Sequence, residues 1–95
     1  MDVAATSSEY LHITVTATLA GDPLTLTTPP QIAIIPGSTN PAEDDWHTGT
    51  WADGHARIRL GPGGITLTPG TYWTWIRFAA GSEQPVHRAG RIRIY

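Results

Sequence analysis

The segment Leu67–Phe78 constrains the fold more than any other part of this chain. It reads Leu-Thr-Pro-Gly-Thr-Tyr-Trp-Thr-Trp-Ile-Arg-Phe, a Pro-Gly turn signal followed by side chains that alternate with a period of two. Successive side chains of a strand point to opposite faces. One face therefore carries Tyr72, Thr74, Ile76 and Phe78, and the other carries Trp73, Trp75 and Arg77. Both faces hold large groups, so we expect one to pack in the core and the other to meet a partner.

The rest of the chain also favours strands. No window has helical periodicity, and the threonine-rich composition disfavours helices and suits strands. Asp53-Gly54 is a strong hairpin signal between two of the strands, and Gly90 marks a bulge in the last one. The expected strands cover residues 9–19, 24–27, 31–35, 46–51, 55–60, 65–67, 71–79 and 86–95.

Seven or eight short strands with turns between them predict an all-β fold. We expect a single antiparallel β-sandwich of the immunoglobulin or fibronectin III-like kind, since 95 residues suit one domain. Residues 1–8 are expected to form an N-terminal arm and residues 9–95 the sandwich. The spacing of Asn40, Pro41 and Glu43 is that of a helix start, so at most one helical turn is predicted near 41–46.

The run Leu67-x-Pro69-Gly70-x-Tyr72 resembles the tyrosine corner of immunoglobulin and fibronectin type III domains. The resemblance implies that Tyr72 forms a hydrogen bond back to the upstream backbone and that Leu67 packs beneath it. The Cys…Trp…Cys pattern of antibody domains is absent because the chain has no cysteine. Only the wider immunoglobulin-like class is therefore implied.

Composition and charge exclude several classes of function. The net charge of −2 and the pI near 6.0 argue against a general nucleic-acid binder. No apolar run reaches the roughly 20 residues of a membrane span, and no secretory signal is visible at the N-terminus. All six basic residues are arginine, which suits partly desolvated contacts and equally reflects a GC-rich genome.

Catalytic and metal-binding patterns are also missing. No serine has the context of a nucleophile elbow, and the four histidines lack the spacing of a helical zinc site. The acidic run 43–45 lacks the alternate spacing of a calcium loop, which favours a solvated loop. We predict that the chain is not an enzyme and has neither a metal nor another cofactor.

Arginine and tryptophan, which dominate binding hot spots, gather at outward positions of the expected strands. If those strands are neighbours, one sheet face carries a partner-binding surface, with the acidic loop 43–45 as a patch of opposite sign. A second interpretation needs no partner, because arginines can stack on the tryptophans and cover them. The predicted partner-binding residues are Arg57, Arg59, Trp73, Trp75, Arg77, Arg91 and Arg93.

Several segments follow one another along nearly the whole chain, among them Trp46-His-Thr-Gly-Thr-Trp51, Leu67-Thr-Pro-Gly-Thr-Tyr72 and Arg88-Ala-Gly-Arg91. Their order is similar to that of small β-sandwich virion proteins of tailed phages that infect actinobacteria. The amino-terminal sandwich of phage upper baseplate proteins is similar as well. The resemblance implies a non-enzymatic virion structural protein, most simply a capsid decoration or minor head protein and alternatively a tail or baseplate adaptor. Its partners would be other virion proteins and copies of itself, and its location the virion.

A carbohydrate-binding module is the alternative from another class. Trp73 and Trp75 lie two residues apart on one strand face, which places them about 7 Å apart by ordinary strand rise. Rings at this spacing can line a sugar chain, provided that both are exposed.

Overall fold

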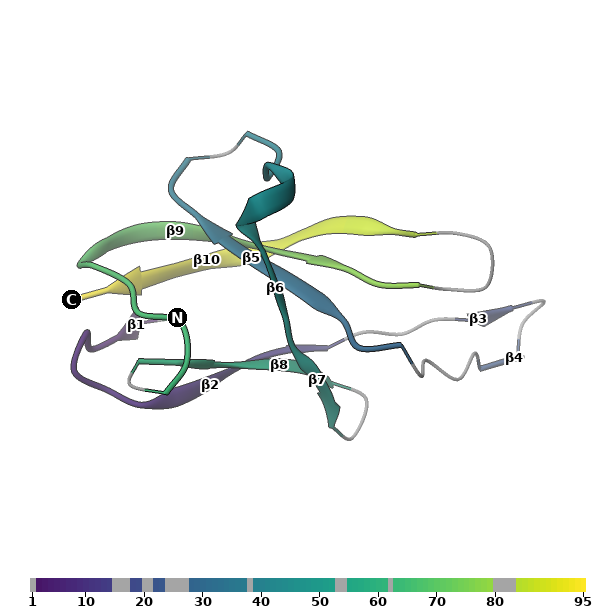
Figure 1. The fold of residues 1–95 in the computed structure, drawn as a ribbon, viewed down its shortest axis with the longest axis horizontal. Helices are drawn as coiled ribbons and strands as arrows, with labels where there is room; N and C mark the ends of the chain where they lie inside the picture. Colours follow the sequence, from purple (N-terminus) through teal and green to yellow (C-terminus); the bar gives the residue numbers. More distant parts are fainter. Residues whose placement is uncertain are drawn as a thin grey trace.

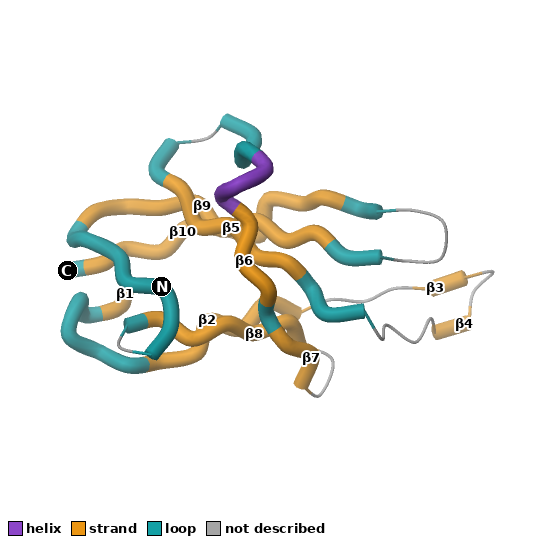
Figure 2. Tube along the Cα trace, in the orientation of Figure 1, coloured by secondary structure: helices purple, strands orange, loops and turns teal. Residues whose placement is uncertain are grey.

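Two β-sheets packed face to face make up the fold (Figure 1). The computed structural model describes residues 2–14, 18–19, 22–23, 28–37, 39–52, 55–61, 63–79 and 84–95. The strands are β1 (Asp2–Val3), β2 (Glu9–Thr14), β3 (Thr18–Leu19), β4 (Asp22–Pro23), β5 (Gln31–Ile35), β6 (Trp46–Thr48), β7 (Thr50–Ala52), β8 (His55–Leu60), β9 (Gly70–Arg77) and β10 (Val86–Ile94). A single 3₁₀ turn, η1 (Glu43–Asp45), precedes β6 and is drawn in purple in Figure 2.

The two main sheets contain eight of the described strands. The five-stranded sheet runs β1-β10-β9-β5-β6 and the three-stranded sheet runs β2-β8-β7, while β3 and β4 pair with each other. The penultimate strand β9 lies between β5 and β10, and β8 lies between β2 and β7. All pairings within the two sheets are antiparallel except that of β1 with β10. The predicted all-β sandwich, with eight strands in its two sheets, is confirmed.

The main core lies between the sheets and confirms the predicted orientation of the side chains of β9. Ile76 and Phe78 are buried in this core, and Tyr72 packs against it. Ile32 of β5 has no exposed surface and pairs with Ile76 across the two strands. The three-stranded sheet supplies the opposite wall, with Leu11, Ile13, Ala56, Ile58 and Leu60.

The predicted corner before β9 is present. The Tyr72 hydroxyl donates a hydrogen bond of 2.7 Å to the backbone oxygen of Thr68. Leu67 packs against the main core. Pro69 and Gly70 lie at the turn between Leu67 and Tyr72, and both are exposed. The local sequence therefore fixes where β9 begins and which of its faces enters the core.

Residues 2 and 3, which we expected in an N-terminal arm, belong to the sandwich instead. They form β1, which pairs in parallel with the end of β10, and Val3 is only 2 % exposed. The backbone continues this contact, because the amide of Ala5 donates to the Tyr95 oxygen at 2.6 Å. The two ends of the described chain consequently lie at the same end of the sandwich (Figure 1).

The expected strand 46–51 is divided between the two sheets at Gly49. Strand β6 pairs with β5, whereas β7 pairs with β8, and the chain crosses the edge of the sandwich between them (Figure 1). The Gly49 amide donates to the Pro30 oxygen at 2.8 Å. A Cβ atom at Gly49 would lie 2.7 Å from the backbone oxygen of Arg57, so the crossing requires glycine.

The crossing also explains why Trp46 and Trp51 face opposite ways. Trp51 points inward and contacts Phe78 edge-on with ring centroids 5.9 Å apart. Its indole nitrogen donates to the Thr28 oxygen at 2.7 Å. Trp46 instead packs on the outer side of the five-stranded sheet.

The predicted helical turn near 41–46 is confirmed as η1, but its capping differs from the expectation. Ala42 rather than Asn40 occupies the N-cap position, and its amide donates to the Asp45 carboxylate at 2.8 Å. The predicted hairpin at 53–54 is supported by the antiparallel pairing of β7 with β8, although its tip lies outside the described residues, as does the expected strand 24–27. No helix among the described residues is long and apolar enough to cross a bilayer.

Candidate functional site

The outer side of the five-stranded sheet carries its own small apolar cluster. Ala33, Ile35 and Trp75 are buried in it, and Trp46 and Trp73 pack against it half-buried. Trp75 is only 9 % exposed, so the expectation that it is available to a partner is wrong. Its neighbours on β5 and β6 cover it, because three strands contribute apolar side chains to one patch. We call the outer surface formed by Trp46, Trp73, Trp75, Arg77, Arg88, Arg91 and Arg93 the Trp/Arg face.

In the half of the Trp/Arg face next to Trp46, the Arg77 side chain is fully engaged by neighbouring residues. Its guanidinium carbon lies 4.6 Å above the ring of Trp46, and its Nε donates to the Gln31 side-chain oxygen at 2.6 Å. Its two terminal nitrogens donate to both oxygens of Glu43 at 2.8 and 3.0 Å. The Arg77 side chain is 13 % exposed, and all three of its nitrogens are engaged. Arg77 therefore holds η1 against the sheet and is not free to bind a partner.

This ion pair predicts a pH dependence of stability. Hydrogen bonding and charge attraction from Arg77 hold the pKa of Glu43 below its ordinary value of 4.5. Because the folded pKa is the lower one, the pair stabilises the fold fully above the unfolded value and loses this contribution as the pH falls through the folded value. We expect Glu43→Gln to be less stable than the wild type near pH 7, and this difference to become smaller at a second, acidic pH below 4.5, as measured by urea unfolding. An equal difference at both pH values would show that Glu43 acts through packing instead.

The other half of the Trp/Arg face remains open. The guanidinium carbons of Arg88 and Arg91 lie 4.5 and 5.3 Å from the ring centroid of Trp73, and that of Arg93 lies 5.8 Å from Tyr95. All three arginines are exposed. No carboxylate in the described part of the chain forms an ion pair with any of them. We call Trp73, Arg88, Arg91 and Arg93 the open half of the face.

Arg88 was not among the predicted binding residues, and a β-bulge explains why. Alternation counted back from the inward Ile92 and Ile94 would turn Arg88 toward the core. The register instead shifts between Arg88 and Gly90, so that Arg88 lies opposite Trp75 while Arg91 lies opposite Trp73. The predicted bulge at Gly90 is thus present, and it brings both arginines onto one face. Gly90 was the signal in the sequence that could have revealed Arg88.

Arg57 and Arg59 do not join the Trp/Arg face, so the prediction of one continuous surface is wrong. They lie on β8 in the three-stranded sheet, whereas Arg77, Arg91 and Arg93 lie in the other sheet. The error has a simple cause. Strand alternation tells which residues of one strand share a face, but it does not tell which strands are neighbours.

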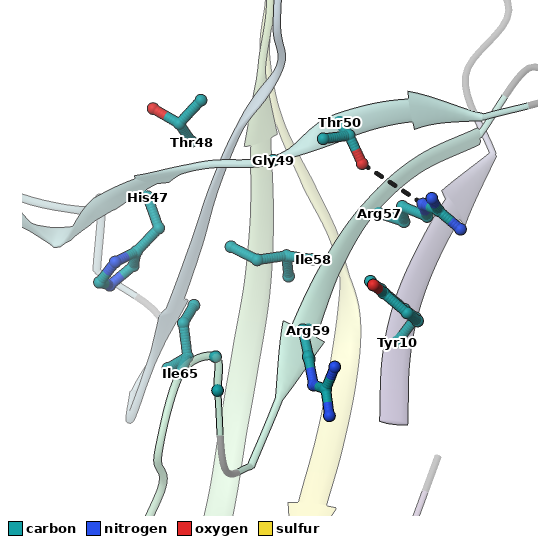
Figure 3. Close-up of a pocket in the computed structure, with 11 residues that line it drawn as sticks. Tyr10, His47, Thr48, Gly49, Thr50, Arg57, Ile58, Arg59 and Ile65 are labelled. Carbon is teal, nitrogen blue, oxygen red and sulfur yellow. Dashed lines mark hydrogen bonds between the residues drawn. The ribbon is translucent and has the colours of Figure 1, made fainter. Parts of the chain in front are cut away.

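A groove runs beside β8 at the edge where the chain crosses between the sheets. Its volume is about 450 Å³. In Figure 3, Tyr10, Arg57 and Arg59 lie on one side of it, His47 and Ile65 lie on the other, and Ile58 lies between. The full lining is Tyr10, His47, Thr48, Gly49, Thr50, Arg57, Ile58, Arg59, Gly63, Gly64 and Ile65.

The buried position of Trp75 bears on the carbohydrate-binding alternative. A two-ring sugar platform needs both indoles exposed, but Trp75 is buried and Trp73 is overlaid by Arg88 and Arg91. Trp73 and Trp75 therefore do not form such a platform in this structure.

The acidic loop 43–45 holds the local fold in place. Glu43 pairs with Arg77, and Asp45 accepts a hydrogen bond from the Ala42 amide. Among the described residues, no three histidine or acidic side chains gather in an arrangement that could hold a metal ion.

Comparison with known proteins gives no relative from which a role could be transferred. No protein-family model, no curated protein and no solved structure matches this chain. Its function therefore has to be inferred from its own surfaces.

Proposed function

We propose that this chain is a non-enzymatic structural protein that docks on an acidic protein surface through the open half of the Trp/Arg face. The observation that carries the proposal is the set of arginines Arg88, Arg91 and Arg93. They are exposed, they are stacked on aromatic rings, and no described carboxylate neutralises them. Such a surface carries charge that a partner's carboxylates can neutralise.

The stacking of the arginines favours binding. A guanidinium presents a planar fork of donors that can hold a carboxylate through two parallel hydrogen bonds. Arg88 and Arg91 are already placed over Trp73, so less side-chain freedom is lost when they bind. Trp73 adds a half-buried apolar base beneath them, and a partner would complete its burial.

The resemblance to phage virion proteins points to the assembly in which such a partner would be found. We propose a capsid decoration or minor head protein first, with the major capsid protein as the partner, and a tail or baseplate adaptor as the alternative. Copy number separates the two roles, because a head lattice presents on the order of hundreds of equivalent sites and a tail on the order of tens.

The test uses particles made from the genome that encodes the chain. We expect mass spectrometry of gradient-purified particles to detect the chain. Added protein should bind particles that lack it, with affinity falling as salt is raised. The double variant Arg88→Gln/Arg91→Gln should bind at least about tenfold more weakly, because two charge-assisted hydrogen-bonding groups are lost. Glu9→Gln, which removes one charge at an exposed position of the three-stranded sheet outside both proposed surfaces, is the control and should not weaken binding.

Two results would contradict the proposal. A particle proteome without this chain would remove the virion assignment. Equal binding by the double variant and the wild type would remove the Trp/Arg face as the docking surface, even if the chain is part of the particle.

A further inference from the structure

The groove beside β8 is a second candidate surface, and its position follows from the topology. Strand β7 pairs with residues 55–57 of β8. Along the same edge, no described strand lies beside residues 58–60 of β8. Residues 63–65 lie there instead, and the Ile65 amide donates to the Arg59 oxygen at 2.9 Å. The groove lies between these residues and the crossing at Gly49. Ile58 and the half-buried Ile65 give it apolar walls.

Arg57 is held in place at this groove without being neutralised. Its Nε donates to the Thr50 hydroxyl at 3.3 Å, and its guanidinium carbon lies 4.6 Å from the ring centroid of Tyr10 (Figure 3). These contacts leave both terminal nitrogens without an acceptor among the described residues. No described carboxylate forms an ion pair with it.

Arg59 is held in a similar way. Its Nε and one terminal nitrogen donate to the hydroxyl of Ser8 at 3.0 and 2.7 Å. The other terminal nitrogen has no acceptor among the described residues, and no described carboxylate pairs with the side chain. Two positioned cations therefore lie side by side at the groove, and no carboxylate in the part of the chain that the structure describes pairs with either of them.

We propose that this groove binds an extended acidic peptide segment whose carboxylates occupy alternate positions. Arg57 and Arg59 lie two residues apart on one strand face, a separation of about 7 Å by strand rise. Alternate side chains of an extended peptide have the same separation, so each carboxylate meets one guanidinium. The side chain between them projects the other way. The volume of about 450 Å³ is that of an ordinary ligand site.

A peptide fits this site better than a nucleic acid does. Base recognition on single strands relies on open aromatic faces, and Arg57 already occupies the face of Tyr10. The site also has only two arginines on a chain whose net charge is −2. With the Trp/Arg face on the other sheet, this second site would let one domain bridge two acidic partners.

The test uses labelled peptides and fluorescence anisotropy. The probe peptide is Thr-Thr-Glu-Thr-Glu-Thr, and the control of the same composition, Thr-Thr-Glu-Glu-Thr-Thr, places its carboxylates side by side. We expect the alternating peptide to bind at least about fivefold more tightly. Arg57→Gln and Arg59→Gln should each weaken it about tenfold, since each removes a charge-assisted contact. His87→Gln, an exposed position on the opposite sheet that belongs to neither proposed surface, should leave the affinity unchanged.

A milder variant keeps the test decisive if an arginine variant does not fold. Thr50→Val retains the charge of Arg57 but removes the acceptor for its Nε, and it should weaken peptide binding about threefold. Nuclear magnetic resonance shifts on peptide addition should centre on Tyr10, Thr50 and Arg59.

Several outcomes would overturn the proposal. Equal affinity for the two peptides would show attraction to net charge alone. Displacement of the peptide by inorganic phosphate at the same concentration would indicate a site for single anions. Tighter binding of an oligothymidylate of matched charge would indicate a nucleic acid. None of these results affects the docking role of the Trp/Arg face, which is tested with Arg88 and Arg91.

Discussion

Replacement of Trp75 by alanine is expected to lower the free energy of unfolding by about 3–5 kcal/mol. Trp75 is 9 % exposed and fills the centre of the apolar cluster on the outer side of the five-stranded sheet, with Ala33 and Ile35 beside it. Its removal leaves a cavity that the paired strands β5 and β9 cannot close, because their backbone hydrogen bonds fix the spacing between them.

Urea unfolding followed by circular dichroism measures this change. Trp75→Phe is the matched control and should cost about 1–2 kcal/mol, because it keeps most of the apolar volume. It also removes an indole N–H that is buried and finds no acceptor among the described residues, which offsets part of the loss. A wild-type stability for Trp75→Ala would mean that this tryptophan is exposed and free to bind, as first expected from the sequence.

Gly61→Ala is expected to destabilise the fold by about 3 kcal/mol or more. Gly61 has a φ of +91°, a backbone conformation that residues other than glycine rarely adopt. An added Cβ would overlap the backbone oxygen of Ser7. The backbone at Gly61 and the backbone at Ser7 would have to move apart. The overlapping atom belongs to the backbone, so rotation of a side chain cannot relieve the clash.

Gly37→Ala separates the two contributions. Gly37 has a similar φ of +83°, but nothing lies within 4 Å of the position that its Cβ would take. Gly37→Ala should therefore lower the free energy of unfolding by only about 1 kcal/mol, which is the cost of the backbone conformation without a steric clash. Thermal unfolding of the two variants under identical conditions gives the difference. Equal losses would show that the backbone at Gly61 moves easily and is not held against Ser7.

The sequence predicted best what is decided locally. The Pro-Gly turn, the alternation that follows it and the tyrosine corner involve residues within a few positions of one another, and together they placed Tyr72 inward and both indoles on the opposite face. The prediction of the bulge at Gly90 rests on the same kind of information. These features depend on backbone geometry that neighbouring residues impose.

What the sequence did not reveal depends on pairing between distant residues. Alternation could not show that Arg57 belongs to a different sheet from Arg77, because strand neighbours are set by packing of the whole chain. It could not show that Trp75 is covered by side chains from β5 and β6, or that Val3 completes the core through a parallel contact with β10. Gly49, lying between two strand halves, was the available sign that the strand changes sheets.

The parallel contact between β1 and β10 has a mechanical consequence. The Tyr95 amide donates to the Val3 oxygen at 3.0 Å, and the Ala5 amide donates to the Tyr95 oxygen at 2.6 Å. A force that pulls residue 2 and residue 95 in opposite directions acts along these two strands, since they run the same way. It strains their backbone hydrogen bonds together instead of peeling them apart one after another. If neighbouring domains pulled on these two positions, the hydrogen bonds between β1 and β10 would therefore bear the load together and resist the force.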